Sequence, residues 1–305
     1  MLETVNIHIE TVAQMHQMLN VAKPRHPLFS ILRFEDFPKI EIKQRTRLVT
    51  DFYQVTLKKA HPCKIQYGQN IFDFNEGIIS CFAPKQVAFI NQDFRPATSG
   101  WQVSIHPDFL RLHPLGKKIK AYGFFEYAVN EALILSDEEQ QSIESIFLQI
   151  EKEYYLPIDS FSQDVIVSNL DLLLTYCNRY YNRQFITRKA LSHELLIRFE
   201  EVLGRQMENA AESGLPTVAH LADQMNLSPK YLSDCLKQLT GQTTQQIIHD
   251  RIVEQAKGLL TSTTLTINEI AFQLGFEQSQ SFSKLFKSKS ALTPLAFRQS
   301  FNQLR

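Results

Sequence analysis

The sequence predicts an α+β fold, with a small antiparallel β-barrel and helices in its N-terminal part and an all-α domain at its C-terminal end. Short β-type runs separated by turn residues fill positions 27–106, as in a small barrel or sandwich. After Pro107 the apolar residues follow helical spacing. Beyond residue 213 the sequence repeats at an offset of 49 to 50 residues, which indicates two copies of one helical motif.

The composition is that of a folded protein in aqueous solution. The chain has 305 residues, of which 44% are hydrophobic and 21% charged, and its formal net charge is zero. This length is sufficient for two domains that each bury a core. No stretch approaches the ~20 apolar residues that span a bilayer, and residues 1–20 lack the basic start and apolar run of a signal peptide. We therefore expect a cytoplasmic protein with no membrane partner.

Cysteine usage gives no indication of a metal site. The four cysteines are Cys63, Cys81, Cys177 and Cys235. They show no CxxC and no Cys/His spacing of a zinc site. In a reducing compartment they are expected to behave as small, partly buried hydrophobic residues. We expect no bound metal and no cofactor.

The N-terminal strands are predicted from alternation. Residues 47–57 indicate one half-buried strand with period two. Its apolar face would carry Val49, Tyr53, Val55 and Leu57, and its polar face Thr50, Gln54 and Thr56. Further strands are expected at 64–67, 71–74, 78–82, 87–90 and 101–105.

Helical segments follow the strands. Ser136 and Glu139 form a capping-box pattern at the start of one amphipathic helix, and residues 160–180 and 183–205 continue the helical pattern. The first two helices would either cover the barrel or form a dimer seam. The polar residues 208–214 are expected to form the end of the linker that leads into the C-terminal domain. We therefore expect a β-rich domain over 1–135, a helical dimerisation or connector region over 136–205, and a C-terminal domain over 206–305.

The repeat aligns residues 217–227 with 266–276 and, after one extra residue, Leu232-Ser233 with Phe282-Ser283. In each copy a threonine caps a short first helix, and Asn226 or Gly275 occupies a turn where positive φ is tolerated. A second helix follows, starting at Pro229 or near Glu277. Its inner face would be Leu232, Leu236 and Leu239 in one copy and Phe282, Leu285 and Phe286 in the other. Two such copies joined by a helix-compatible segment over 244–260 indicate tandem helix-turn-helix motifs.

The repeat resembles the DNA-binding domain of the AraC/XylS family of bacterial transcription regulators over roughly residues 215–301. The residues that carry this resemblance are Leu227–Leu232, Thr240-Gly241, Arg251-Ile252, Ala256, Leu259-Leu260, Ile267, Ile270-Ala271, Gly275-Phe276, Phe282–Lys284, Phe286-Lys287, Thr293-Pro294 and Arg298. One departure is Ala291, because the family usually has glycine after the second recognition helix. An alanine in a left-handed conformation would cost ~1 kcal/mol.

The resemblance implies a sequence-specific regulator that inserts two recognition helices into successive major grooves of double-stranded DNA, ~34 Å apart. The outward residues expected to reach base edges are Lys230, Ser233, Asp234, Ser279, Gln280 and Lys284. Among them, Gln280 can pair with adenine, Lys284 with guanine and Asp234 with cytosine. The residues expected at phosphates are Lys237, Thr243, Lys287, Thr293 and Arg298.

The resemblance further implies a homodimer, contact with RNA polymerase, and a cupin-like N-terminal domain that senses a small ligand. Aromatic residues that could line an effector pocket are Phe34, Phe52, Tyr53, Tyr67, Phe72, Phe74 and Trp101. Two alternatives remain open. A metal-dependent cupin enzyme needs clustered ligands, whereas His61 and His106 stand alone and Asp73 and Glu76 lie at a turn, so we expect no enzyme. Alternatively, the N-terminal domain serves only for dimerisation.

Overall fold

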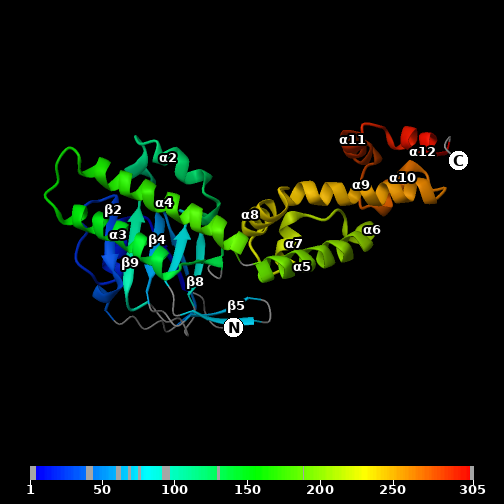
Figure 1. Cartoon of the computed structure of the whole chain (residues 1–305). Helices are drawn as coiled ribbons and strands as arrows, with labels where there is room; N and C mark the ends of the chain where they lie inside the picture. Colours follow the sequence, from blue (N-terminus) through cyan, green and yellow to red (C-terminus); the bar gives the residue numbers. More distant parts are fainter. Residues whose placement is uncertain are drawn as a thin grey trace. The chain divides into compact units, whose positions relative to one another are not determined.

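The computed structural model describes residues 5–38, 44–59, 63–67, 70–74, 77–90, 97–128, 131–187 and 189–302, and the chain forms two units, Met1–Gln184 and Phe185–Arg305 (Figure 1). The region expected as a separate connector, 136–205, is therefore shared between the two units. No helix of the described residues is long and apolar enough to cross a membrane.

The first unit contains three sheets. A five-stranded antiparallel sheet has the order β10 (Leu133–Ile134), β7 (Ile78–Phe82), β4 (Tyr53–Lys58), β9 (Gly100–Ile105) and β2 (Phe29–Arg33). A three-stranded sheet has β3 (Thr46–Thr50) between β1 (Val5–Ile9) and β8 (Val87–Ile90), with β1 parallel to β3. A hairpin pairs β5 (Cys63–Tyr67) with β6 (Asn70–Phe74). The predicted short strands are present, but pairing among the described residues does not close these sheets into a barrel.

The prediction of one strand over 47–57 is wrong. The chain bends at Asp51 and Phe52, so that β3 and β4 belong to different sheets. Phe52 is fully buried in a cluster with Val12 and Met15 of α1 (Val12–Met18). Burying this ring beneath α1 is the physical reason for the bend, and alternation alone could not reveal it. The supposed polar face is also covered, because Thr56 is buried and its hydroxyl donates to the Ser80 carbonyl oxygen at 3.3 Å.

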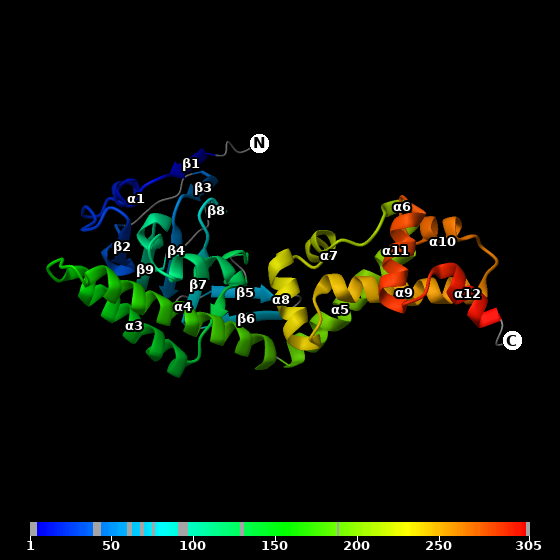
Figure 2. The same ribbon diagram turned by 90° about the horizontal axis from the view of Figure 1, so that it is seen from above.

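Two long helices lie across one face of the five-stranded sheet, α3 (Asp137–Tyr155) and α4 (Ser162–Thr187) (Figure 2). The predicted capping box of α3 is confirmed. Trp101 of β9 stacks on Phe147 of α3 with ring centroids 5.9 Å apart, and Lys59 forms an ion pair with Glu144 at 2.9 Å. These contacts hold α3 on the sheet, so this helix covers the strands. Shorter helical turns complete the unit: η1 (Phe34–Asp36), η2 (Pro107–Leu110), α2 (Leu115–Lys118), η3 (Ile119–Ala121) and η4 (Gly123–Phe125).

The second unit is entirely helical. Its helices are α5 (Lys189–Glu208), α6 (Ala210–Ser213), α7 (Val218–Gln224), α8 (Pro229–Thr240), α9 (Thr244–Ser262), α10 (Ile267–Gln273), α11 (Ser279–Ser290) and α12 (Pro294–Asn302). Residues 208–214, expected to be the end of a linker, are largely helical. They contain the last residue of α5 and the short helix α6, whose Ala210 is fully buried. Phe185 packs edge-on against Tyr231 of α8 at 5.2 Å. The helical domain therefore begins about twenty residues before the predicted boundary.

Ala291 adopts the left-handed conformation that its alignment with a glycine position predicts. It ends α11 at φ 62°, and the aligned Gly241 ends α8 at φ 77°. Ala291→Gly is expected to stabilise the protein by about 0.5–1 kcal/mol, because removing Cβ relieves more strain than the added freedom of the unfolded chain costs. The midpoint of urea denaturation measures this change. Ala296→Gly, inside α12, is the matched control and should destabilise the protein by about 1 kcal/mol. A lower urea midpoint in both variants would contradict the expectation.

Candidate nucleic-acid interface

The first helix-turn-helix motif consists of α7, a turn and α8. The Thr217 hydroxyl caps α7 by accepting from the His220 amide at 3.2 Å, and Asn226 in the turn has φ 56°. The Ser228 hydroxyl caps α8 by accepting from the Tyr231 amide at 3.2 Å. These local signals were all visible in the sequence, and they set where the recognition helix begins.

The second motif repeats this arrangement with α10 and α11. Thr266 and Glu269 form a capping box on α10, and Gly275 in the turn has φ 86°. Helix α11 begins at Ser279, two residues after the predicted start, and Gln278 precedes it without a side-chain cap.

Both recognition helices bury the predicted inner faces. Leu232, Leu236, Phe282 and Phe286 are fully buried, whereas Leu239 and Leu285 are half-buried. The predicted inner face of α8 omits Cys235, which is buried beside these leucines, in agreement with its expected behaviour as a small hydrophobic residue. Burial raises the pKa of the Cys235 thiol to about 12, so this cysteine is a core residue and not a reactive thiol.

Helix α9 separates the two motifs. It has 19 residues, which gives a length of about 28 Å, close to the ~34 Å between successive major grooves on one side of DNA. Its buried residues Ile248, Ile252, Val253, Ala256 and Leu260 form its packing face. Helices α8, α10, α11 and α12 all contact α9, so the two recognition helices are mounted on one rigid element (Figure 1).

The expected base-contacting residues of α8 already have partners within the protein. The Lys230 ammonium forms an ion pair with the Asp234 carboxylate at 3.1 Å, one helical turn apart. The Ser233 hydroxyl is 3.3 Å from the Thr244 hydroxyl, which donates to it. All three side chains are half-buried. The first recognition helix therefore presents a neutralised pair and an engaged hydroxyl.

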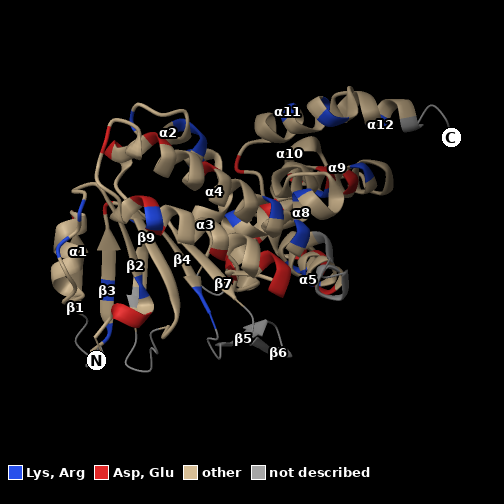
Figure 3. Cartoon of the chain, turned by 60° about the vertical axis from the view of Figure 1, so that its left-hand side comes forward, with Lys and Arg blue, Asp and Glu red and all other residues tan. Residues whose placement is uncertain are grey.

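The expected base-contacting residues of α11 are more open. Gln280 and Lys284 are exposed and Ser279 is half-buried. Within the part of the chain that the structure describes, their side chains make no hydrogen bond or ion pair. Helix α11 also carries three lysines and no Asp or Glu, whereas α8 has two lysines and Asp234 (Figure 3). The second recognition helix therefore has the stronger positive charge.

Known helix-turn-helix proteins match this part of the chain. The helix-turn-helix domain family matches residues 221–300. The chain is 33% identical over 85 residues to the transcriptional activator RhaR of Cronobacter sakazakii, covering 28% of this chain and 30% of that protein. It is 36% identical over 81 residues to the xylose operon regulatory protein of Escherichia coli, covering 27% of this chain and 21% of that protein. Residues 221–300 therefore match a helix-turn-helix domain of the AraC type.

A solved structure is also similar to the AraC-type domain. The C-terminal domain of the response regulator yesN from Fusobacterium nucleatum is 30% identical, with a TM-score of 0.30, over 33% of this chain and 93% of that chain. The protein spans less than a third of the length of either curated relative that it matches.

The expected phosphate contacts of the AraC-type domain fall into two groups. Lys237 and Lys287 are exposed on the two recognition helices. The hydroxyls of Thr243 and Thr293 instead cap α9 and α12, by accepting from the amides of Gln246 and Ala296. A hydroxyl that caps a helix is already engaged, although the helix N-termini that it supports remain suited to anions.

Arg298 differs from the expectation that it reaches outward. Its Nε donates to the carbonyl oxygen of Leu260 at 3.1 Å, and one of its Nη atoms is buried with no partner among the residues that the structure describes. The Leu260 carbonyl belongs to the last turn of α9, where cations are favoured. Arg298 therefore connects α12 to α9 within the AraC-type domain.

Four of the expected effector-pocket residues have described side chains, and each packs against a different neighbour. Phe34 packs on Phe37, Phe52 lies beneath α1, Tyr53 packs on Phe125, and Trp101 stacks on α3. All four are buried. The side chains of Tyr67, Phe72 and Phe74 lie outside the described residues. Across the described ranges, no three His, Cys, Asp or Glu residues are grouped as metal ligands would be.

Proposed function

We propose that the protein is a sequence-specific DNA-binding transcription regulator that places α8 and α11 in successive major grooves of double-stranded DNA. The observation that carries this proposal is the mounting of two helix-turn-helix motifs at the two ends of one 19-residue helix. The exposed Gln280 and Lys284 side chains on α11 have the chemistry to read adenine and guanine.

The remaining partners follow from the same proposal. A homodimer would bind paired sites more tightly than a monomer through effective concentration, and a regulator of this kind acts on RNA polymerase. The N-terminal unit would control DNA binding by taking up a small ligand. Support for a ligand comes from the relatives, one of which is named a regulator of a xylose operon. The protein would have no catalytic activity and would act in the cytoplasm.

Selection of bound sites from random DNA with the full-length protein tests this function. We expect a motif with two conserved segments whose centres are about 10–11 base pairs apart, since both recognition helices lie on one side of the duplex. The double variant Gln280→Ala, Lys284→Ala is the control and should lose preference in one segment only. Binding that falls steeply with salt but selects no motif would be non-specific and would contradict the proposal.

The Lys230–Asp234 pair leads to a prediction about the first recognition helix. Asp234→Ala is expected to raise affinity for random DNA about two- to fivefold, because it removes a carboxylate repelled by phosphates and releases Lys230. It should also abolish preference at one position of the first segment, where the carboxylate accepts from cytosine. Site selection with this variant measures both effects. A selected motif identical to that of the unmodified protein would show that Asp234 serves only as a partner for Lys230.

A further inference from the structure

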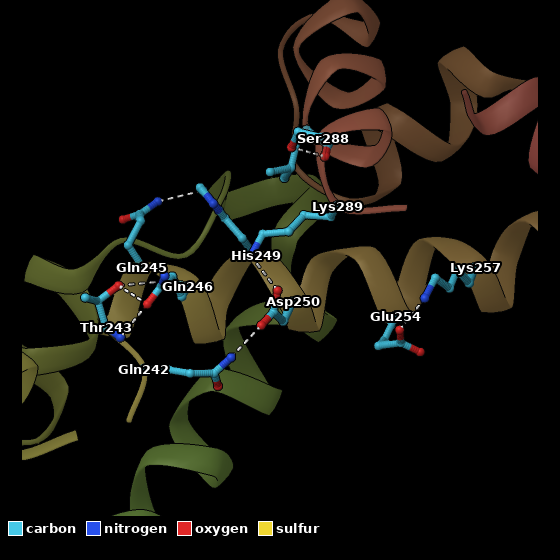
Figure 4. Close-up of polar contacts among 11 residues, drawn as sticks. Gln242, Thr243, Gln245, Gln246, His249, Asp250, Glu254, Lys257, Ser288 and Lys289 are labelled. Atoms are coloured by element: carbon cyan, nitrogen blue, oxygen red, sulfur yellow. Dashed lines mark hydrogen bonds and ion pairs between the residues drawn. The ribbon is translucent and has the colours of Figure 1, made fainter. Parts of the chain in front are cut away.

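One carboxylate in α9 accepts from both helix-turn-helix motifs. Asp250 receives the Lys289 ammonium on Oδ1 at 2.7 Å and the Gln242 amide nitrogen on Oδ2 at 2.9 Å (Figure 4). Gln242 follows Gly241, which ends α8, and Lys289 lies in the last turn of α11. The two oxygens of Asp250 therefore join the C-terminal ends of the two recognition helices.

The chemistry of this contact is suited to orientation. Both bonds go to an ionised acceptor, which makes them shorter and stronger than neutral hydrogen bonds. The hydrogen bond from Lys289 lowers the pKa of the Asp250 carboxyl, so the carboxylate is charged at neutral pH. The Nε2 atom of the neighbouring His249 lies 2.8 Å from the Gln245 amide nitrogen. The pKa of His249 is lowered mainly by burial and also by the positive charge of Lys289. His249 is therefore uncharged at pH 7 and does not compete with Lys289 for Asp250.

The contact is not a property of a single motif. At the repeat offset of 50 residues, Gln242 aligns with Leu292 and Lys289 aligns with Leu239. Neither leucine side chain can donate a hydrogen bond, so neither motif reproduces this side-chain contact within itself. The helix α9 sets the distance between the motifs along its axis, whereas lateral contacts to α9 set the direction in which each recognition helix projects. Asp250 is one such contact, and it involves both motifs at once.

We propose that Asp250 is a positioning residue that holds the two recognition helices in one relative orientation and so makes the protein selective for the spacing of its two DNA segments. This inference rests on the proposed DNA-binding function. The side chains of Asp250 and Lys289 are 41% and 31% exposed, and an exposed ion pair changes an equilibrium constant by at most about fivefold. The effect of Asp250 is therefore on spacing preference, and the fold does not depend on it.

The test uses the full-length protein and the site that it selects from random DNA. Affinities are measured for this site and for a version with one base pair inserted between the two segments, which rotates one segment by about 35° relative to the other. The spacing ratio is the affinity for the selected site divided by the affinity for the site with the insertion. This ratio is compared between the unmodified protein and Asp250→Ala. Glu254→Ala is the matched control. Glu254 is an acidic residue one turn further along α9, and among the described residues it pairs only with Lys257 of the same helix (Figure 4).

We expect the ratio to fall about two- to fivefold in Asp250→Ala and to stay unchanged in Glu254→Ala, although both variants gain the same charge. The exchanged pair Asp250→Lys, Lys289→Asp restores the ion pair in the opposite direction, and we expect it to recover the ratio. Circular dichroism and thermal unfolding verify that each variant is folded; an unfolded Asp250→Ala would itself overturn the claim that the fold does not depend on this contact.

Two results would overturn the inference in distinguishable ways. Equal ratios in Asp250→Ala and Glu254→Ala, in a protein that selects a clear motif, would remove the positioning role and leave the DNA-binding function intact. Failure of the unmodified protein to select any motif would remove both.

Discussion

Replacing Gly275 with alanine is expected to lower the free energy of unfolding by about 2–4 kcal/mol. Gly275 has φ 86°, and a Cβ atom there would lie 2.8 Å from the Ala210 carbonyl oxygen and 2.8 Å from the Gly214 carbonyl carbon. The left-handed conformation alone costs about 1 kcal/mol for alanine, and forcing extra volume into a packed contact costs about 1–3 kcal/mol more. Backbone atoms cannot yield as a flexible side chain would, so the second motif must shift away from α6.

Gly241→Ala is the matched control for this prediction. Gly241 is left-handed at φ 77° and ψ −4°, but a Cβ atom there would meet no atom within 4 Å. This variant should therefore cost only about 1 kcal/mol, the strain of the backbone itself. Chemical denaturation followed by circular dichroism measures both variants. If Gly275→Ala cost no more than the control, the close approach of the second turn to residues 210–215 would not exist in solution.

Lys284→Ala is expected to reduce affinity for the selected site by about 1–3 kcal/mol and to relax preference at one base position. Lys284 is exposed in the middle of α11, and among the described residues it has no partner that competes with a guanine edge. The substitution should change affinity for random DNA much less than it changes affinity for the selected site. Fluorescence anisotropy on selected and scrambled duplexes measures this difference.

Lys287→Ala is the comparison, because it removes the same charge from the same helix one turn later. A phosphate contact carries no sequence information, so this variant should weaken binding to both duplexes alike and reduce the slope of log affinity against log salt by about one. Equal losses on selected and scrambled DNA for Lys284→Ala would assign that lysine to the backbone. A sequence-dependent loss for Lys287→Ala would assign it to a base.

The sequence determined most of the C-terminal domain by itself. The threonine caps, Pro229 at the start of α8, the left-handed turn residues and the repeat offset all act within a few residues of where they stand. For this reason the sequence predicts where the helices of both motifs begin to within about two residues, and it predicts the left-handed conformation of Ala291, whose φ is 62°. Strands β5 to β9 are predicted for the same reason, because a short β-type run bounded by turn residues is a local property, whereas β1, β2 and β10 are not predicted individually.

Only the tertiary structure decided how these elements meet. The strand over 47–57 is split because Phe52 is buried beneath a helix that lies some forty residues earlier in the chain. The Arg298 side chain turns inward to a carbonyl of α9, although its type and position suggested a phosphate contact. Asp250 joins residues 242 and 289. Contacts of this kind connect residues that are distant in sequence, so they leave no periodic pattern. Burial in the folded chain decides which charged side chains remain exposed on the recognition helices and which hold the domain together.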